Sequence, residues 1–299
     1  MGKKICVLVC CHKKDICATI PPYVPIHVGA DLHKENLKMI SDNTGVNISN
    51  KNATFCELTG LYWAWKNLQS VDVIGLCHYR RYFDFHHMGD SPYPETEISS
   101  ELFQKVDLSI PQEVIDDVNN GMLIVPQANR GPFSLYNDYC IGHISDDIKV
   151  LEDILKQRND EEILKAYFHV MHQGNKFYPY NMFLMKWKDF DDYCTWLFDV
   201  LFELEKRLDI SNYNAYQKRI FGFLSERLFN VWIYAHSGNI REKPILWFVN
   251  NPQSHSLADK IKFKCKGWAN DLAVKLVCPK SYSNWRRNEL PKYLLNGKN

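Results

Sequence analysis

The 299-residue sequence lacks the motifs by which several large enzyme classes are recognised. It has no GxxxxGK(S/T) phosphate loop and no GxGxxG after its first apolar run, which argues against a P-loop kinase and a typical Rossmann dehydrogenase. It also has no HExxH, no GxSxG and no Cys/His set at zinc-ligand spacing, so zinc peptidases, serine hydrolases of the elbow type and structural zinc proteins are not supported. The chemistry must come from residues outside these motifs.

Paired cysteines and long apolar runs are missing as well. The ten cysteines include no CxxC pair, and several fall inside predicted strands, so we interpret them as reduced, structural thiols of a cytoplasmic protein. The apolar stretch after Lys4 is about seven residues long and runs into His12 without a small-residue cleavage site, unlike a secretory signal. No window reaches the roughly 18 apolar residues of a membrane span.

Charge is balanced overall but not along the chain. The formal net charge is +1, yet residues 260–299 hold ten Lys and Arg against two acids. We therefore expect a single catalytic domain at residues 1–250 and a basic appendage at residues 251–299.

Apolar runs and amphipathic stretches alternate in the order typical of an α/β protein. Short apolar runs predict strands at residues 5–11, 26–28, 73–76, 121–126, 181–187 and 245–249. Spacing near 3.6 residues predicts helices at residues 53–68, 144–157, 160–171, 190–208 and 216–236. Residues 42–52 and 88–100 are expected to be loops. The predicted fold is a mostly parallel central sheet flanked by helices.

Polar clusters follow the predicted strands, where α/β sheets bind ligands. They are His12 and Lys13 after the first strand, a loop with Asn47, Ser49, Lys51 and Asn52, and the run His78, Tyr79, Arg80 and Arg81. Arginine binds phosphate oxygens in a bidentate manner, lysine adds a point charge, and a loop entering a helix offers free N–H groups. The clusters predict an anionic, nucleotide-like ligand. In the alternative interpretation, one of the arginines pairs with Asp84 or another acid at the core edge.

Several longer blocks resemble a known family. They are VGADL, SDNTGVNISNKNATFCELTGLYWAWKN, DVIGLCHYRRYF, NMFLMKW, FDDYCTWLFDVL and RIFGFLSERLFNVWIYAH. Over roughly residues 4–250 the sequence resembles a bacterial family long filed as a domain of unknown function, whose members lie in capsular and exopolysaccharide gene clusters as proposed glycosyltransferases. The resemblance implies a variant of the GT-A glycosyltransferase fold and a nucleotide-sugar donor. It favours UDP-galactose, in pyranose or furanose form, and an acceptor in a capsular, exopolysaccharide or O-antigen repeat unit.

The sequence departs from the usual GT-A pattern at the metal-binding motif. Where GT-A enzymes carry Asp-x-Asp to hold a divalent metal on the diphosphate, this sequence has His78-Tyr79-Arg80, while residues 45–52 resemble the segment that touches the donor. Mg²⁺ prefers carboxylates and water. We therefore expect no metal cofactor and assign stabilisation of the departing diphosphate to His78, Arg80, Arg81 and Lys51.

An inverting transfer needs a carboxylate base, whereas a retaining one does not. Glu226 is the first candidate, with Asp138 and Glu57 in reserve. The alternative for each of these is an ion pair on a helix face.

Aromatic and polar residues near Gly174 and Pro179 are predicted to contact the acceptor. They are His172, Tyr178, Tyr180 and Asn181, placed in a loop where flat rings can pack against sugars. Packing in the core is the alternative for the neighbouring Phe177 and Phe183.

The basic appendage alternates lysines with apolar residues, a composition that binds anionic membrane surfaces. Its alternatives are a solvated basic helix and a dimer contact. The leading function is a cytoplasmic glycosyltransferase at the inner face of the membrane, and the alternative is a non-catalytic nucleotide- or carbohydrate-binding protein. Nucleic acid is not expected as a partner, because the basic residues form no aromatic-interleaved stripe across the fold.

Overall fold

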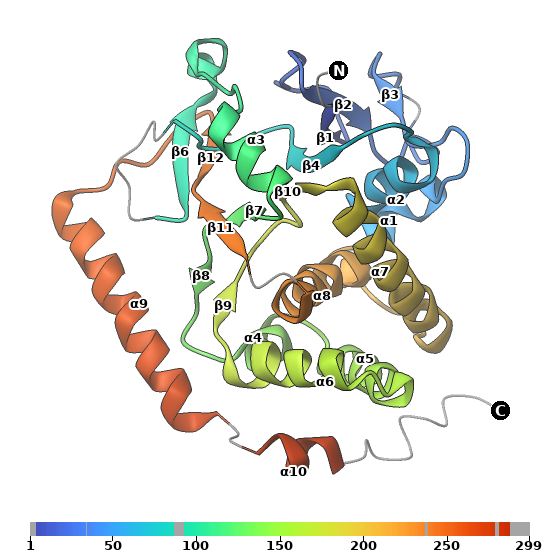
Figure 1. The fold of residues 1–299 in the computed structure, drawn as a ribbon, viewed down its shortest axis with the longest axis vertical. Helices are drawn as coiled ribbons and strands as arrows, with labels where there is room; N and C mark the ends of the chain where they lie inside the picture. The colour runs from blue at the N-terminus through green and yellow to red at the C-terminus, as the bar shows by residue number, and fades with distance from the viewer. Residues whose placement is uncertain (1–3, 34, 87–92, 237–238, 279–280, 288–299) are drawn as a thin grey trace. The chain divides into compact units, whose positions relative to one another are not determined.

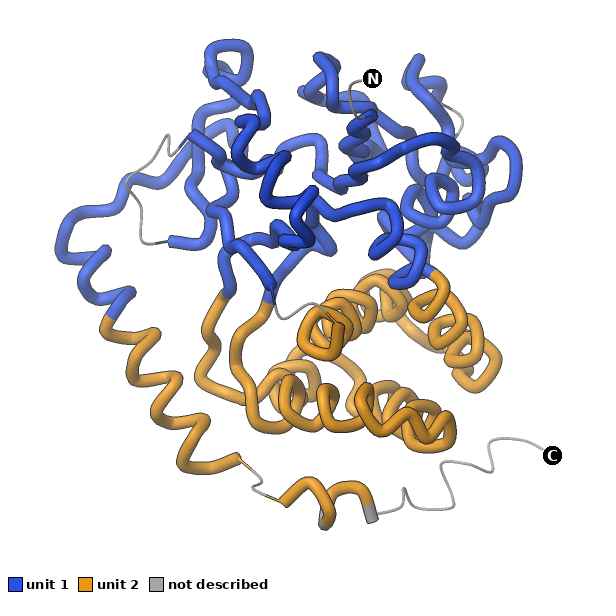
Figure 2. Tube along the Cα trace, in the orientation of Figure 1, with its two compact units in different colours: residues 1–128, 178–194, 239–264 blue, residues 129–177, 195–238, 265–299 orange. Residues whose placement is uncertain are grey.

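A computed structural model describes residues 4–33, 35–86, 93–236, 239–278 and 281–287. Figure 1 shows the course of the chain. The chain forms two compact units, each made of three separate stretches of sequence (Figure 2). Unit 1 comprises residues 1–128, 178–194 and 239–264, and unit 2 comprises residues 129–177, 195–238 and 265–299. The proposed boundary at residue 250 stays a prediction.

Unit 1 is built on a ten-stranded sheet, counted over the described residues. Its strands are β1 (Ile5–Cys11), β2 (Tyr23–His27), β3 (Ile40–Ser41), β4 (Val73–His78), β5 (Arg81–Phe83), β6 (Glu95–Ser99), β7 (Leu123–Pro126), β10 (Phe183–Lys186), β11 (Ile240–Lys243) and β12 (Ile245–Val249). Its helices are η1 (Ser49–Lys51), α1 (Asn52–Phe55), α2 (Leu58–Asn67), η2 (Ser100–Lys105) and α3 (Gln112–Asn119).

The main path of this sheet runs β11-β7-β10-β4-β1-β2-β3. The pairs β1–β2, β1–β4, β2–β3 and β7–β11 are parallel, while β10 is antiparallel to both β4 and β7. In register, Cys10 lies beside His78. The carboxyl ends of β1 and β4 therefore meet at one edge of the sheet, as the strand pattern predicts.

The core of unit 1 lies against this sheet. It includes alternate residues of β1 such as Val7 and Val9, together with Tyr82, Phe103 and Phe248, which contact one another in edge-on and tilted ring pairs. β1 is buried along nearly its whole length, which explains its continuous apolar run.

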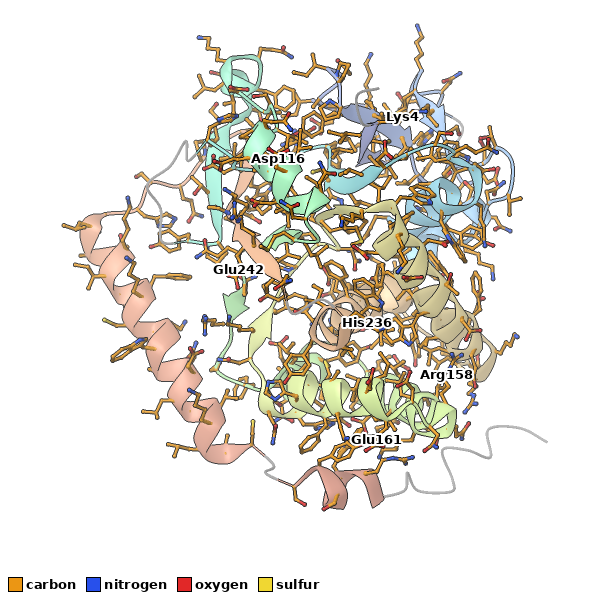
Figure 3. All side chains as sticks on the ribbon, in the orientation of Figure 1. Lys4, Asp116, Arg158, Glu161, His236 and Glu242 are labelled. Atoms are coloured by element: carbon orange, nitrogen blue, oxygen red, sulfur yellow. The ribbon has the colours of Figure 1, made fainter. Side chains whose placement is uncertain are left out.

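Unit 2 is mainly helical. Its elements are the two-stranded β8 (Asn129–Arg130) and β9 (Lys176–Phe177), α4 (Leu135–Gly142), α5 (Ser145–Arg158), α6 (Glu161–Tyr167), the π-helical turn η3 (Phe168–Gln173), η4 (Gln217–Arg219), α8 (Ile220–His236) and α10 (Tyr282–Arg287). Two longer helices, α7 (Trp187–Arg207) and α9 (Leu257–Val277), contribute residues to both units. Figure 3 marks Arg158, Glu161 and His236 on the helices of unit 2.

The strand predicted at residues 5–11 is confirmed, and the helices predicted near residues 144–157 and 216–236 are confirmed within a few residues. The single helix predicted at residues 53–68 is wrong, because Cys56 has φ 52° and ψ −132°, which ends α1 before α2 begins. The loop predicted at residues 88–100 is also wrong from residue 95 onward, where β6 pairs in parallel with β12. Residues 88–92 of that prediction lie outside the described residues.

Candidate functional site

The ends of β1 and β4 bring two of the predicted polar clusters together in unit 1. The His12 ring lies edge-on to the Tyr79 ring at 5.3 Å, and the Lys13 Nζ lies 5.8 Å from the centre of the same ring. The side chain of Lys13 is 55% exposed, and its Nζ lies 3.8 Å from the Asp15 carboxylate. These residues form what we call the strand-end corner, together with His78, Arg80 and Arg81.

The run from His78 to Arg81 is a hairpin turn between two strands. His78 of β4 pairs with Arg81 of β5 across Tyr79 and Arg80, and the sequence pattern did not anticipate β5. The turn is also held from outside, because the N–H of Phe248 in β12 donates to the carbonyl of Arg80 at 2.8 Å. Arg80 is thus presented by a rigid backbone turn.

The Arg80 guanidinium is engaged by Asp15 in a fork geometry. Its Nε lies 3.1 Å from both carboxylate oxygens of Asp15, and its Nη2 lies 2.9 Å from Oδ1. Burial raises the pKa of Asp15, but the hydrogen bonds and charge of Arg80 outweigh this and hold that pKa below its ordinary value. Arg80 therefore pairs with an acid, as the alternative interpretation allowed, although the acid is not Asp84.

Arg81 sits in a different environment. Its guanidinium carbon lies 4.6 Å from the Tyr180 ring centre and 4.5 Å from that of Trp247, and its Nε is 3.4 Å from the Glu95 carboxylate. Burial, followed by the nearby Glu95, raises the pKa of Tyr180. Since two rings and a carboxylate surround Arg81, its first role is to fix the Tyr180 segment.

The Tyr180 segment connects His78 to a carboxylate. The ring Nε2 of His78 lies 2.8 Å from the Tyr180 carbonyl, and the next residue, Asn181, donates from Nδ2 to Glu57 Oε1 at 2.7 Å. Tyr180 and Asn181 have φ of 72° and 51°, and Cys56 beside Glu57 also has a positive φ. Backbone conformations of this kind cost about 1–3 kcal/mol each and cluster at functional sites.

The side chains of the predicted donor loop form hydrogen bonds with the loop itself and with residues close to it in sequence. The Ser49 hydroxyl is fully buried, donates to Asp42 Oδ1 at 2.5 Å and accepts from the Asp31 N–H at 3.1 Å. The Asn52 amide donates to the Cys56 carbonyl at 2.7 Å and to Thr59 at 3.0 Å. Asn47 accepts from the Ser49 N–H at 3.1 Å and donates to Gly45. These contacts give the three side chains a structural role, and their contact with a donor stays a prediction.

Lys51 lies between Ser49 and Asn52 at the end of η1, and its Nζ lies 5.8 Å from the Phe55 ring centre. Of the four residues predicted in this loop, it alone brings a charge. Its assignment to the diphosphate stays a prediction.

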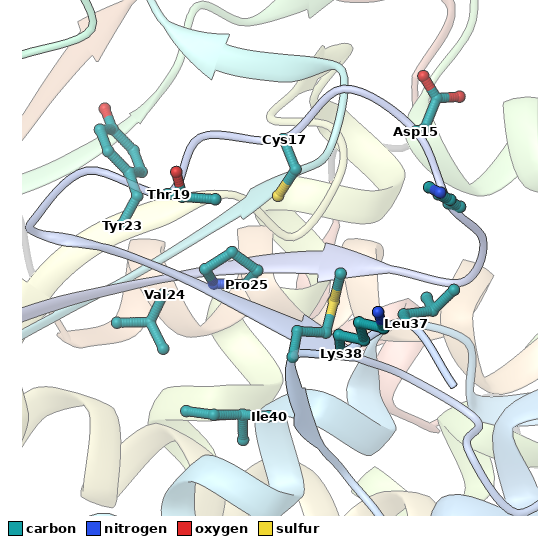
Figure 4. A pocket seen from close by; sticks show the side chains of 11 residues that line it. Asp15, Cys17, Thr19, Tyr23, Val24, Pro25, Leu37, Lys38 and Ile40 are labelled. Atoms are coloured by element: carbon teal, nitrogen blue, oxygen red, sulfur yellow. The ribbon is translucent and has the colours of Figure 1, made fainter. Parts of the chain in front are cut away.

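A cavity of about 540 Å³ opens beside Asp15. Figure 4 shows its lining from the segment after β1 (Asp15, Cys17, Thr19), from the start of β2, and from residues 37–40 with Lys38. This volume suits a small ligand. Asp15, Lys14 and Lys38 were missed from the sequence, although Asp15 directly follows the His12–Lys14 cluster that ends β1.

The remaining predicted residues of unit 1 are close to β11 and β10. The hydroxyl of the buried Tyr178 donates to Glu242 Oε1 at 3.0 Å, and Glu242, labelled in Figure 3, also accepts from the Ala128 N–H at 3.2 Å. Tyr178 thus joins the chain before β10 to β11.

Unit 2 holds the other candidates. Arg227, 8% exposed, lies 3.4 Å from both Glu226 and Asp138, in agreement with the ion-pair alternative for these two acids. His172 Nε2 lies 2.5 Å from Glu152 Oε1, and its ring stacks on Tyr136. His172 therefore belongs to an aromatic cluster of unit 2, whereas Tyr178, Tyr180 and Asn181 belong to unit 1.

Among the residues that the structure describes, no three His, Cys, Asp or Glu side chains are grouped as a metal site. The resemblance places His78, Tyr79 and Arg80 at the Asp-x-Asp position, and the expectation that no metal is needed there stays a prediction.

Comparison with known proteins gives two matches of different kinds. The chain resembles the solved apo structure of the WbbM bifunctional glycosyltransferase with a TM-score of 0.73 and 25% identity over 85% of this chain and 48% of that one. The chain thus spans about half the length of that structure. This likeness, with the strand order above, confirms the GT-A-like α/β fold. No curated protein matches.

The second match is to a protein family. Residues 6–237, most of the chain, match the family described as Domain of unknown function (DUF4422). The protein therefore belongs to the DUF4422 family.

Proposed function

We propose that this protein is a glycosyltransferase that moves a sugar from a nucleotide diphosphate donor to a glycan acceptor. The observation that carries the proposal is the likeness to a glycosyltransferase over 85% of the chain. The strand-end corner supports it, because Lys13, Arg80 and His12 gather where open α/β sheets bind ligands.

The finer assignment is a UDP-hexose donor, with galactose favoured, and an acceptor in a capsular, exopolysaccharide or O-antigen repeat unit. It rests on the resemblance of the sequence blocks to a family from polysaccharide gene clusters. The cavity beside Asp15 is the place that we assign to the nucleoside, because Asp15, which lines it, pairs with Arg80 and because its volume is suitable.

In the proposed reaction, the bond between the anomeric carbon and the diphosphate oxygen breaks and the electron pair leaves with the diphosphate. Lys13 and Arg80 offset the charge that develops there, and a guanidinium held in one orientation by Asp15 needs little reorganisation. Arg81, held between Tyr180 and Trp247, contributes at longer range. The acceptor oxygen forms the new bond to the anomeric carbon.

For an inverting reaction we propose Glu57 as the base that takes the acceptor proton. Glu57 was a reserve candidate in the sequence, and the structure links it through Asn181 to the segment that contacts His78. The first candidate, Glu226, is paired with Arg227 in unit 2. A retaining reaction would use neither carboxylate as a base.

The alternative, a non-catalytic nucleotide- or carbohydrate-binding protein, would use the same cationic corner. The two functions differ in slow hydrolysis of the donor, since a transferase leaks sugar to water and a binder does not.

The test is calorimetry of the full chain with UDP, GDP and ADP, with and without EDTA, followed by an assay for hydrolysis of UDP-galactose. We expect selective, EDTA-insensitive UDP binding that Arg80→Ala weakens at least tenfold. Arg241→Ala is the matched control, because Arg241 of β11 pairs with Asp117 of α3 in the same unit and lies outside the corner. A requirement for Mg²⁺ or Mn²⁺ would overturn the proposal that the diphosphate is bound without a metal. Absence of nucleotide binding would overturn the proposal that the protein is a glycosyltransferase.

A further inference from the structure

The 21-residue helix α9 exposes most of its large apolar side chains, whereas a helix that packs on a protein buries them. Of its large apolar residues, only Val274 is buried, at 2% exposure. Six others are 56–85% exposed: Leu257, Ile261, Trp268, Leu272, Leu276 and Val277. Figure 1 shows α9 as one continuous helix.

Five of these six residues, all except Val277 at the end of the helix, form one stripe. Their spacing of four, seven, four and four residues returns to the same side of an α-helix, within an arc of about 100° at 3.6 residues per turn. We call this set the outer stripe. Trp268 stands near its middle and is 85% exposed.

The opposite face is attached by polar contacts in unit 2. Asp271 accepts from Arg130 at 2.5 Å and from Asn175 at 3.0 Å, and Asn270 donates to the Arg130 carbonyl at 2.9 Å. Val274 lies on this same face, one turn further on. Directional contacts to β8 and to the chain before β9 thus fix which side of this part of α9 faces outward.

Lysines border the outer stripe on both sides. Lys264 and Lys275 lie along one edge and Lys262 and Lys266 beyond the other, and all four are exposed. The two acids of the helix are committed elsewhere, because Asp271 pairs with Arg130 and Asp259 accepts from Ser256 at the start of the helix. An exposed apolar stripe with lysines on both sides is complementary to a surface that has an apolar interior and anionic groups at its boundary with water.

We propose that the outer stripe of α9 docks the protein on an anionic lipid bilayer, with the helix lying in the interface plane. In such a geometry the apolar residues enter the boundary between headgroups and acyl chains, while the flanking lysines reach anionic headgroups. Tryptophan favours this depth because its ring is apolar and its N–H is polar. None of the described helices is apolar enough over a sufficient length to cross a bilayer.

A second copy of the chain fits the stripe less well. Pairing of α9 with itself would bring the lysine rows of two copies together, and like charges beside an apolar seam disfavour association. A membrane supplies the opposite charge. Vesicle binding and the oligomeric state in solution distinguish a bilayer from a second copy as the occupant of the outer stripe.

The test is sedimentation of the full chain with sucrose-loaded vesicles of phosphatidylcholine alone and of phosphatidylcholine with an equal amount of phosphatidylglycerol. We expect binding to the anionic vesicles that weakens at high salt. Each lysine contributes about fivefold to the partition coefficient. The variant Lys262→Gln, Lys264→Gln, Lys266→Gln, Lys275→Gln should therefore bind at least tenfold more weakly, and Trp268→Glu with Leu272→Glu should abolish binding.

The control removes the same charge elsewhere. Lys105→Gln, Lys165→Gln, Lys188→Gln, Lys206→Gln changes four exposed lysines outside α9 and should leave vesicle binding within about threefold of the parent protein. Circular dichroism checks that each variant is folded, and UDP binding should be unchanged, since none of these residues lies in the strand-end corner.

Three results would overturn the proposal. The first is equal loss in the control and the α9 lysine variant, which would mean attraction by net charge alone. The second is absence of binding to anionic vesicles by the parent protein. The third is a dimer in sedimentation velocity that the Trp268→Glu, Leu272→Glu variant dissociates, which would make a second copy the occupant of the stripe.

Discussion

Replacing Arg80 by alanine removes one side of the Arg80–Asp15 pair and, in our proposal, one contact to the donor diphosphate. The side chains of Arg80 and Asp15 are 26% and 11% exposed, between the exposed pairs that contribute about 0–1 kcal/mol and the buried pairs whose disruption costs about 3–5 kcal/mol. The fork geometry adds strength and orientation. We therefore expect a coupling free energy of about 2 kcal/mol between the two residues.

The assay is a double-mutant cycle of Arg80→Ala, Asp15→Ala and the double variant, with urea unfolding followed by tryptophan fluorescence. UDP binding of the same proteins separates structure from function. Arg80→Ala should weaken UDP binding at least tenfold, whereas Asp15→Ala keeps the guanidinium, removes only the contact that orients it, and should weaken UDP binding less than Arg80→Ala does. A coupling below about 0.5 kcal/mol would refute the structural part of the reasoning, and equal losses of UDP affinity in both single variants would refute the direct contact.

Three further outcomes are expected. The pKa of Asp15 is lowered in the folded state, so the stability it contributes is present above the unfolded pKa near 3.9 and is lost as pH falls through the folded value; the difference in unfolding free energy between the parent and Asp15→Asn should be present at pH 7 and shrink as pH falls below about 3.9. Cys56→Gly should raise the unfolding free energy by about 1 kcal/mol, because glycine adopts φ 52° without strain, while Cys56→Ala should give no gain; equal effects would contradict this. If the reaction inverts, Glu57→Gln should lower kcat about 100-fold or more with UDP affinity unchanged and Glu226→Gln should lower it only a few-fold; the reverse order in steady-state kinetics would restore Glu226 as the base.

The sequence predicted the parts of the site that depend on strand ends. Because β1 is an uninterrupted apolar run, its end at Cys11 could be placed, and with it the approach of His12 and Lys13 to Tyr79. The partner of Arg80 could not be placed, since the path of the connection after β1, which carries Asp15, is set by the fold and not by a residue pattern.

Features that depend on backbone conformation at single residues escaped prediction. Cys56 divides α1 from α2 without a glycine or proline to signal the break, and Tyr180 and Asn181 take positive φ where glycine would be expected. β5 has three residues, too few for a period-two pattern, so the turn at Arg80 was not visible in the sequence. In the loop at residues 47–52, the residue types were those expected at a ligand. In the structure, however, Ser49 hydrogen-bonds to Asp42 and Asn52 hydrogen-bonds to the Cys56 carbonyl.

The bond from Phe248 to the Arg80 carbonyl has a consequence for the order of events during synthesis. Residue 80 leaves the ribosome 168 residues before residue 248, the one that holds the turn closed. At 5–20 residues per second, the nascent chain waits about 10–30 s with this turn unsupported on its outer side. A chain released before β12 would retain every residue of the corner and still lack the strand that fixes Arg80 in place.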